Sequence, residues 1–411
     1  MELKTKYQYT YFIYPYIIKQ NEYNKYLKKL LNNPNFAMKI FDKEKDEDLY
    51  SYFLPKVRDT MFWTMNYDKN NFMKLDEISK DMRSTLISQY PCTMFEYFLN
   101  ENIQGKAGKR DGIFFDITNI ELVCFESGIC FLLMKTVLED NHNLSDLCNF
   151  NYKFRDIKSS AYEYRGYENI KIQTDRFDNI REITDLIKEI TGNSTEATKL
   201  NIDTDRFITY SYACVGQEDW NGTNSELLEK EFYKFANVEK ADYKVDSCET
   251  NLVNKMSIIE KSKNELYGCS NVGTVLLTSD VSSENYTKRQ REFERQYLYQ
   301  YIFNLYKKIS LKKLNYDLQK KNMLNQFKEE FEKFIQAAGM EEITNDNIGS
   351  QLECEWTRVL KINTIYLQLK NKYDMLYKNS NIEKNASTNK TIVVILVVLV
   401  IMNLISIIKI F

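Results

Sequence analysis

The feature that most constrains this chain is an apolar run close to its C-terminus. Residues 391–408 read TIVVILVVLVIMNLISII and carry no charged side chain. As a helix rising about 1.5 Å per residue, the run is roughly 27 Å long, close to the ~30 Å hydrocarbon thickness of a bilayer. A buried strand or core helix is the alternative, but soluble strands are rarely this long. The run therefore predicts one transmembrane helix.

The flanking charges predict how such a helix would be oriented. Lys378, Lys384 and Lys390 precede the run, whereas Lys409 alone follows it. An excess of lysine marks the cytoplasmic side. The first 20 residues lack the continuous apolar core of a signal peptide, and the eight cysteines include no C-x-x-C pair. The sequence thus predicts a tail-anchored, single-pass membrane protein with a cytoplasmic N-terminal body.

Two polar side chains interrupt the apolar run. Asn403 and Ser406 are three residues apart and would share one helix face. One interpretation is an interhelical hydrogen bond that specifies self-association of the helix. The other is a polar position that is simply tolerated, and the sequence does not decide between them.

The preceding residues favour an α+β fold. A chain of 411 residues with only four prolines and twelve glycines favours long helices, and its length indicates more than one folded unit. Residues 1–280 form the predicted sensing or binding domain, in which β-branched and aromatic runs alternate with helical patterns. The strands are predicted at 7–18, within 112–138, at 206–215 and at 273–278, and the helices at 21–31, 144–157 and 180–190.

Residues 285–378 predict a long antiparallel helical hairpin. Residues 289–338 lack proline and glycine. A second helix follows, with an apolar stripe at heptad-like spacing formed by Leu352, Trp356, Val359, Ile362, Tyr366, Leu369, Tyr373 and Leu376. Packing of one helix on the other is the simplest use of the stripe, and coiled-coil self-assembly is the alternative. Residues 379–390 read as a polar linker.

Residues that carry recognisable chemistry are few. His142 is the only histidine, which excludes a histidine metal cluster within one chain, and no catalytic motif indicates an enzyme or a cofactor. A net charge of −2 argues against nucleic acid as a partner. The segment 104–112 contains Lys106, Lys109 and Arg110 among glycines, which is a weak pattern for binding the phosphate of a small nucleotide. A flexible basic loop is the alternative.

The order of these parts resembles CorA-type divalent-cation channels. An α+β domain precedes long helices, which begin near YLYQYIFNLYKKISLKKL, and a C-terminal apolar segment follows. The resemblance implies an oligomeric membrane protein, and CorA-like effectors of nucleotide-signalled antiviral systems have the same layout. CorA proteins carry two membrane helices joined by a Gly-Met-Asn loop. This chain has one such segment, in which Met402-Asn403 follows Ile401, so no pore or metal residue is transferred.

Three functions remain open from the sequence. The first is a non-enzymatic bacterial membrane effector, in which a cytosolic sensing domain acts through a helical stalk on a channel-like homo-oligomer. Its partners would be the lipid bilayer, further copies of the chain and a small nucleotide or ion. The second is a tail-anchored scaffold that displays a protein-binding domain. The third is an enzyme with an unrecognised site.

Overall fold

The strands form one large mixed sheet. The computed structural model describes residues 3–66, 78–99, 103–107, 113–139, 142–157, 171–173, 181–192, 196–245, 257–262, 264–281, 284–318, 324–339 and 342–408. Within them the strands are β1 (Thr5–Ile17), β2 (Phe36–Met38), β3 (Cys92–Tyr97), β4 (Ile103–Ala107), β5 (Ile113–Phe125), β6 (Ile129–Leu138), β7 (Lys171–Gln173), β8 (Arg181–Glu182), β9 (Ile208–Val215), β10 (Ser257–Ser262), β11 (Glu265–Cys269) and β12 (Gly273–Ser279). The order is β10-β11-β12-β9-β1-β6-β5-β4-β7-β8, and β3 joins β2 to β5. Among the described strand pairs, β12–β9 alone is parallel.

The first strand lies in the middle of this sheet. β1 pairs antiparallel with β6 on one side and with β9 on the other. Its side chains are buried on both faces: Tyr9 and Ile13 belong to one core, and Phe12 and Tyr16 belong to the other. A strand covered on both faces needs apolar residues at nearly every position rather than at alternate ones, which explains its aromatic-rich composition.

The turn between β5 and β6 depends on a glycine. Gly128 has a φ of +80°, and a Cβ atom there would lie 2.1 Å from the carbonyl oxygen of Ile18. Both the left-handed backbone and this close approach exclude larger residues. Glu126, Ser127 and Gly128 thus form the turn between the two strands.

Helices cover both faces of the sheet. The helical segments are α1 (Gln20–Asn32), α2 (Glu47–Tyr52), α3 (Pro55–Met61), η1 (Trp63–Asn66), α5 (Lys80–Ile87), α6 (Leu144–Arg155), α7 (Ile183–Thr191), α8 (Glu196–Lys199), α9 (Gln217–Gly222), α10 (Ser225–Asn237), η2 (Asn285–Arg289), α12 (Gln290–Glu292), η3 (Phe293–Tyr297), α13 (Leu298–Leu318), α14 (Leu324–Ala337), α15 (Asn347–Val359) and α16 (Ile362–Ile408). Side chains of α1, α6, α7 and α10 share one core with the sheet. Those of α2, α3, α13 and α15 share the other. The predicted α+β class is confirmed.

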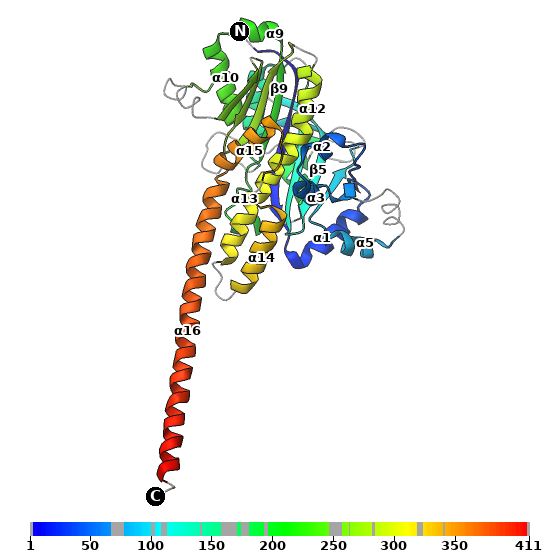
Figure 1. Cartoon of the computed structure of the whole chain (residues 1–411). Coiled ribbons are helices and arrows are strands. Elements are labelled where there is room, and N and C mark those ends of the chain that lie inside the picture. The colour runs from blue at the N-terminus through cyan, green and yellow to red at the C-terminus, as the bar shows by residue number, and fades with distance from the viewer. Residues whose placement is uncertain are drawn as a thin grey trace.

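The C-terminal helices pack around α13 (Figure 1). α13 is buried along most of its length and contacts β6, α14, α15 and α16. α14 runs antiparallel to α16, because Phe327 meets the Tyr373 ring and Phe331 meets the Tyr366 ring. Between α15 and α16 the chain bends at Lys361, whose φ of +58° lies in the left-handed region. Beyond this bend α16 continues away from the body, and residues 379–390 are part of it.

The far end of α16 corrects one prediction from the sequence. Among the described residues, no helix is both long and apolar enough to cross a membrane. The predicted transmembrane helix at 391–408 is therefore wrong. The tail-anchored, single-pass membrane localisation inferred from it is wrong as well.

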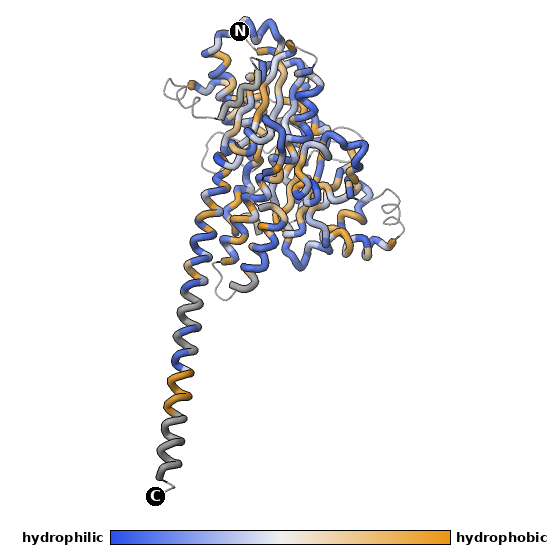
Figure 2. The backbone as a smooth tube through the Cα atoms, in the orientation of Figure 1, coloured by the Kyte–Doolittle hydropathy of each residue, from blue (hydrophilic) through white to orange (hydrophobic). Residues whose placement is uncertain are grey.

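This end of α16 nevertheless carries exposed apolar side chains. The side chains of Ile392–Val397 are 48–61% exposed. Figure 2 shows one continuous hydrophobic band at this end of the coloured part of α16. Scattered apolar residues are normal on a protein surface, but a contiguous band is unusual.

A buried polar network ties the sheet to the start of α13. Glu121 on β5 is 6% exposed and accepts hydrogen bonds from Lys39 Nζ at 2.8 Å, Tyr299 Oη at 3.0 Å and Asn119 Nδ2 at 2.9 Å. Lys39 Nζ also lies 2.9 Å from Tyr299 Oη. The buried charges are thus paired and hydrogen-bonded, as buried ions must be.

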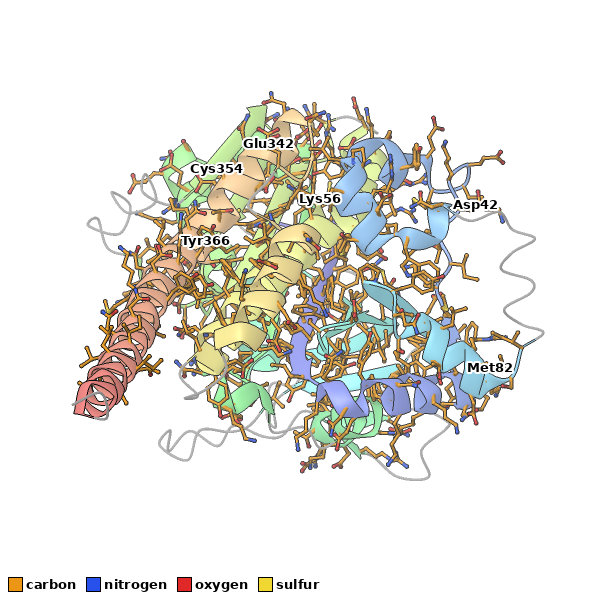
Figure 3. The ribbon with its side chains drawn as sticks, turned by 60° about the horizontal axis from the view of Figure 1, so that its bottom comes forward. Asp42, Lys56, Met82, Glu342, Cys354 and Tyr366 are labelled. Carbon is orange, nitrogen blue, oxygen red and sulfur yellow. The ribbon has the colours of Figure 1, made fainter. Side chains whose placement is uncertain are left out.

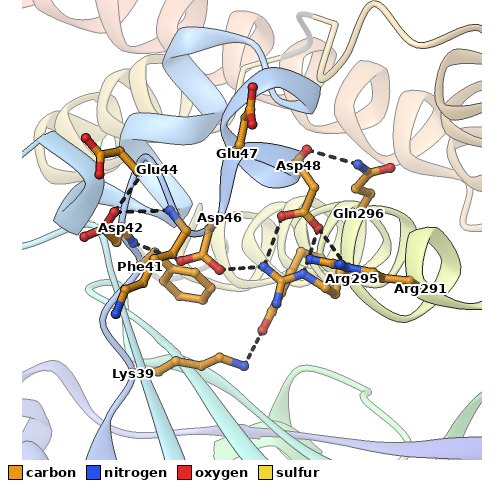
Figure 4. Close-up of polar contacts among 12 residues, drawn as sticks. Lys39, Phe41, Asp42, Glu44, Asp46, Glu47, Asp48, Arg291, Arg295 and Gln296 are labelled. Atoms are coloured by element: carbon orange, nitrogen blue, oxygen red, sulfur yellow. Dashed lines mark hydrogen bonds and ion pairs between the residues drawn. The ribbon is translucent and has the colours of Figure 1, made fainter. Parts of the chain in front are cut away.

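A second ionic contact fixes the turn before α2. Arg295 on η3 donates from Nε to Asp48 at 2.9 Å and from Nη2 to Asp46 at 2.6 Å (Figure 4). Gln296 donates to the backbone carbonyl of Asp48 at 3.0 Å. The acidic residues of this turn are therefore held by protein cations, and they play a structural part.

Candidate functional site

The structure describes one of the three basic residues predicted to bind phosphate. Lys106 lies on β4, half-buried, and its Nζ is 5.5 Å from the centroid of the Phe114 ring. Lys109 and Arg110 lie outside the described residues. The prediction of a phosphate-binding loop therefore remains a prediction.

The two polar residues of the apolar run lie on α16. Asn403 and Ser406 are helical, as their spacing predicted, but their side chains lie outside the described part of the structure. Because the predicted transmembrane helix is wrong, a role for these residues in the association of such a helix is no longer expected. Self-association of the chain stays a prediction.

A different group of basic residues lines a cavity of about 210 Å³, called here the cationic cavity. Arg155, Arg206, Lys308 and Lys312 line it, against a single carboxylate, Asp203. Aromatic, aliphatic and small polar residues complete the lining: Pro15, Asn201, Ile202, Phe207, Ile208, Asn271, Val272, Tyr301, Leu305, Ile309 and Leu360. In a chain whose net charge is −2, this is a local concentration of positive charge.

Backbone pairing brings the two arginines together. The end of α6 and the segment before β9 form a short bridge between Asp156 and Arg206. Phe207 N donates to the Arg155 carbonyl at 2.9 Å. The half-exposed Arg206 side chain forms an ion pair with Asp156 at 2.9 Å. Arg155 differs, because its Nε is buried and has no hydrogen-bond partner among the described residues.

The two lysines share one face of α13. Lys308 and Lys312 are four residues apart, so they are neighbours on the helix surface. Lys312 Nζ donates to the Asn201 carbonyl at 2.7 Å, where the Asn201 backbone adopts a φ of +53°. The partly buried Lys308 side chain forms no hydrogen bond and no ion pair to another described residue. The cavity thus contains a cation that has no counter-ion among the described residues.

Burial and mutual repulsion lower the pKa values of these groups. Burial lowers the pKa of Lys308 to about 8, and the charges of Lys312 and Lys361 add to the effect. Burial also lowers the pKa of Lys312. For Arg155, burial and then the charge of Arg206 lower the pKa, although Asp156 and Asp203 offset part of this. Burial is the largest cause of each of these shifts, and neighbouring cations add to it at Lys308 and Arg155.

Sequence reasoning missed this site because its residues come from distant segments. One signal was available in the run LYKKISLKKL. Lysines four residues apart repel each other on a helix, which is an unfavourable arrangement without a compensating anion. The adjacent lysines, by contrast, have partners within the protein. Lys307 lies 3.6 Å from Glu353, and Lys313 donates to the Ser127 carbonyl at 2.8 Å.

A larger cavity, of about 600 Å³, lies beside α14. Its charged lining is balanced between three lysines and three carboxylates, namely Lys56, Lys313, Lys333, Asp59, Glu126 and Glu330. Lys56, labelled in Figure 3, donates to the Ile335 carbonyl on α14 at 3.3 Å. Balanced charge gives this cavity no preference for an anion or a cation. Among the described residues, no group of three or more His, Cys, Asp or Glu side chains is placed to hold a metal ion.

Comparison with known proteins does not assign a function to the cationic cavity. No protein family matches the chain, and neither a curated relative nor a similar solved structure was found. The resemblance to CorA-type proteins therefore remains untested, and the case for function rests on the geometry of the cavity.

Proposed function

We propose that this protein is a non-enzymatic sensor that binds a small anion in the cationic cavity. The observation that carries the proposal is Lys308, a partly buried cation that has no counter-ion in the described part of the chain. Arg155 lines the same cavity, and its buried Nε has no hydrogen-bond partner there either. Burying a charge without a partner is costly, and a bound anion removes that cost. A volume of about 210 Å³ is smaller than the ~300–1,000 Å³ of pockets for drug-sized ligands, so it suits a compact phosphate or carboxylate compound.

The position of the cavity supports a role in signalling along α16. Leu360, which lines the cavity, directly precedes the left-handed Lys361 at the bend between α15 and α16. A bound anion would draw α13 and the segment before β9 together. This movement would change the packing of the cavity lining around Leu360. Ligand occupancy would then bias the direction or mobility of α16, since a ligand shifts the equilibrium toward the state that it binds better.

The second part of the proposal is that α16 transmits this change to another copy of the chain. Parallel association places the exposed apolar band Ile392–Val397 of one copy against the same band of the next, so apolar residues meet along the whole band. Analytical ultracentrifugation of the full chain should show a homo-oligomer whose stability changes when the cavity is occupied. A monomer at all concentrations would contradict this second part.

Sulfate is a suitable probe for the cavity, because its charge is constant from neutral to alkaline pH. Isothermal titration calorimetry at low ionic strength should show one site per chain. We expect Lys308→Met and Arg155→Met each to weaken binding about tenfold or more, which corresponds to about 1.4 kcal/mol. Lys106→Met is the matched control, since it removes a lysine from the basic segment predicted by the sequence. Loss of binding in Lys106→Met, with normal binding in Lys308→Met, would move the site to that segment.

The same titration has an expected pH dependence. Lys308 must carry its proton to attract the anion, and its pKa is lowered to about 8. Affinity for sulfate should therefore be constant below pH ~8 and should fall by up to about tenfold per pH unit above it. Lys308→Arg keeps its charge throughout this range, so its affinity should stay nearly constant. A wild-type affinity that does not change between pH 7 and pH 9.5 would exclude Lys308 from the site.

A further inference from the structure

We infer that the Lys308 amine captures the carbonyl group of an anionic aldehyde or keto acid as an imine. The inference rests on the proposed function, because the cations around Lys308 would hold the acidic group of such a compound. It goes further by assigning a covalent step to one side chain. The ligand class is then a compact carbonyl acid rather than any small anion.

The geometry favours Lys308 over the other described basic residues of the cavity. Lys312 donates to a backbone carbonyl, and Arg206 is paired with Asp156. Lys308 has neither kind of contact among the described residues, so its amine is free to approach a ligand. Tyr301, Leu305 and Ile309 on the same helix provide an apolar surrounding, and Asp203 is the one carboxylate in the lining.

The electrostatics of the cavity supply the reactive form of the amine. Only the neutral amine is nucleophilic, and a lysine beside other cations in a desolvated site is a known means of obtaining it. With its pKa lowered to about 8, Lys308 is about one-quarter neutral at pH 7.5. An ordinary lysine, with a pKa near 10.4, is roughly 0.1% neutral at that pH. The fraction of reactive amine is therefore about two-hundredfold larger at Lys308.

The proposed step needs no oxidant or reductant. The nitrogen lone pair attacks the carbonyl carbon, a C–N bond forms, and the carbonyl oxygen takes up a proton to give a carbinolamine. The C–O bond then breaks, the hydroxyl group leaves as water with a second proton from solvent, and a C=N bond replaces it. Nitrogen loses two protons, one when the carbinolamine forms and one when the imine forms, and they balance the two protons that the oxygen took up. Hydrolysis reverses the step, so the ligand is captured reversibly.

Reductive trapping tests the inference on the full chain. Glyoxylate is the probe, and sodium cyanoborohydride reduces any imine to a stable carboxymethyl-lysine, which peptide mass spectrometry locates. At pH 7.5 and short times we expect Lys308 to be modified at least tenfold faster than any other lysine, and sulfate should slow its modification. Lys308→Arg should lose this fast modification while still binding sulfate. Lys106→Arg, at a lysine outside the cavity, should still be modified at Lys308.

The two proposals can fail separately. Sulfate binding without preferential modification of Lys308 would overturn the imine inference and leave the anion sensor intact. Fast modification of Lys308 without sulfate binding would overturn the sensor and support the reactive lysine alone. Equal modification of all accessible lysines, unchanged in Lys308→Arg, would show that Lys308 has no special reactivity.

Discussion

Replacing Trp356 with alanine should lower the free energy of unfolding by about 3–5 kcal/mol, the usual cost of removing a large buried aromatic side chain. Trp356 on α15 is fully buried. Its ring centroid lies 5.3 Å from that of Tyr301 on α13, and its Nε1 donates to Thr274 Oγ1 on β12 at 2.8 Å. The substitution leaves a cavity between the two helices and the sheet. It also removes the donor to a buried hydroxyl. Denaturant melts of the full chain measure the loss.

Trp356→Phe is the control for this prediction. Phenylalanine retains most of the ring contact with Tyr301 but loses the hydrogen bond to Thr274, so the expected loss is smaller, about 1–3 kcal/mol. A loss below about 1 kcal/mol for Trp356→Ala would mean that the α15–sheet contact contributes little to stability.

Glu121→Ala should destabilise the protein by about 3–5 kcal/mol, because it leaves Lys39 as a buried cation without its counter-ion. Burial works to raise the pKa of Glu121, but the charge and hydrogen bond of Lys39, together with the bonds from Tyr299 and Asn119, hold it below the ordinary value of 4.5. Burial likewise works to lower the pKa of Lys39, and its contacts with Tyr299 and Glu121 outweigh this. Both groups are therefore charged at neutral pH.

The double variant Lys39→Met/Glu121→Leu distinguishes the ion pair from simple packing. Replacing both charges with apolar side chains should cost much less than Glu121→Ala alone, because no charge is left buried. Since the folded-state pKa of Glu121 is depressed, the pair stabilises the wild type above pH ~4.5, and this contribution is lost as the pH falls below that value. Melts at pH 7 and pH 3.5 should therefore differ less in the double variant. Equal losses in the single and double variants would contradict the pairing.

Local patterns predicted the elements that are buried along a single stretch of sequence. The strand predicted at 7–18 is β1, the helix predicted at 21–31 is α1, and the strand predicted at 273–278 is β12. The composition of each of these elements depends only on how the element itself is buried. Hydrophobic periodicity and β-branched residues in the sequence therefore indicate the element directly. The predicted stripe was also correct for Trp356 and Leu369, both of which are fully buried.

Features set by contacts between distant segments could not be predicted in this way. The apolar stripe continues unbroken through Leu360 and Lys361, yet the chain bends there, because Lys361 takes a left-handed backbone that no local pattern requires. The strands predicted within 112–138 are the long β5 and β6, whose pairing has a register shift between Ile117 and Asn119 that the sequence did not predict. The cationic cavity needs residues that tertiary packing alone brings together.

The central place of the N-terminal strand has a consequence for how the chain is made. β1 is synthesised well before its partner β9, because Thr10 pairs with Ser211 of β9, 201 residues later. At about 5–20 residues per second, synthesis of the intervening ~200 residues takes roughly 10–40 s. During that time one edge of a largely apolar strand has no partner, and such an edge is a template for pairing with other nascent chains. We therefore expect slower synthesis of the segment between β1 and β9 to lower the yield of folded protein.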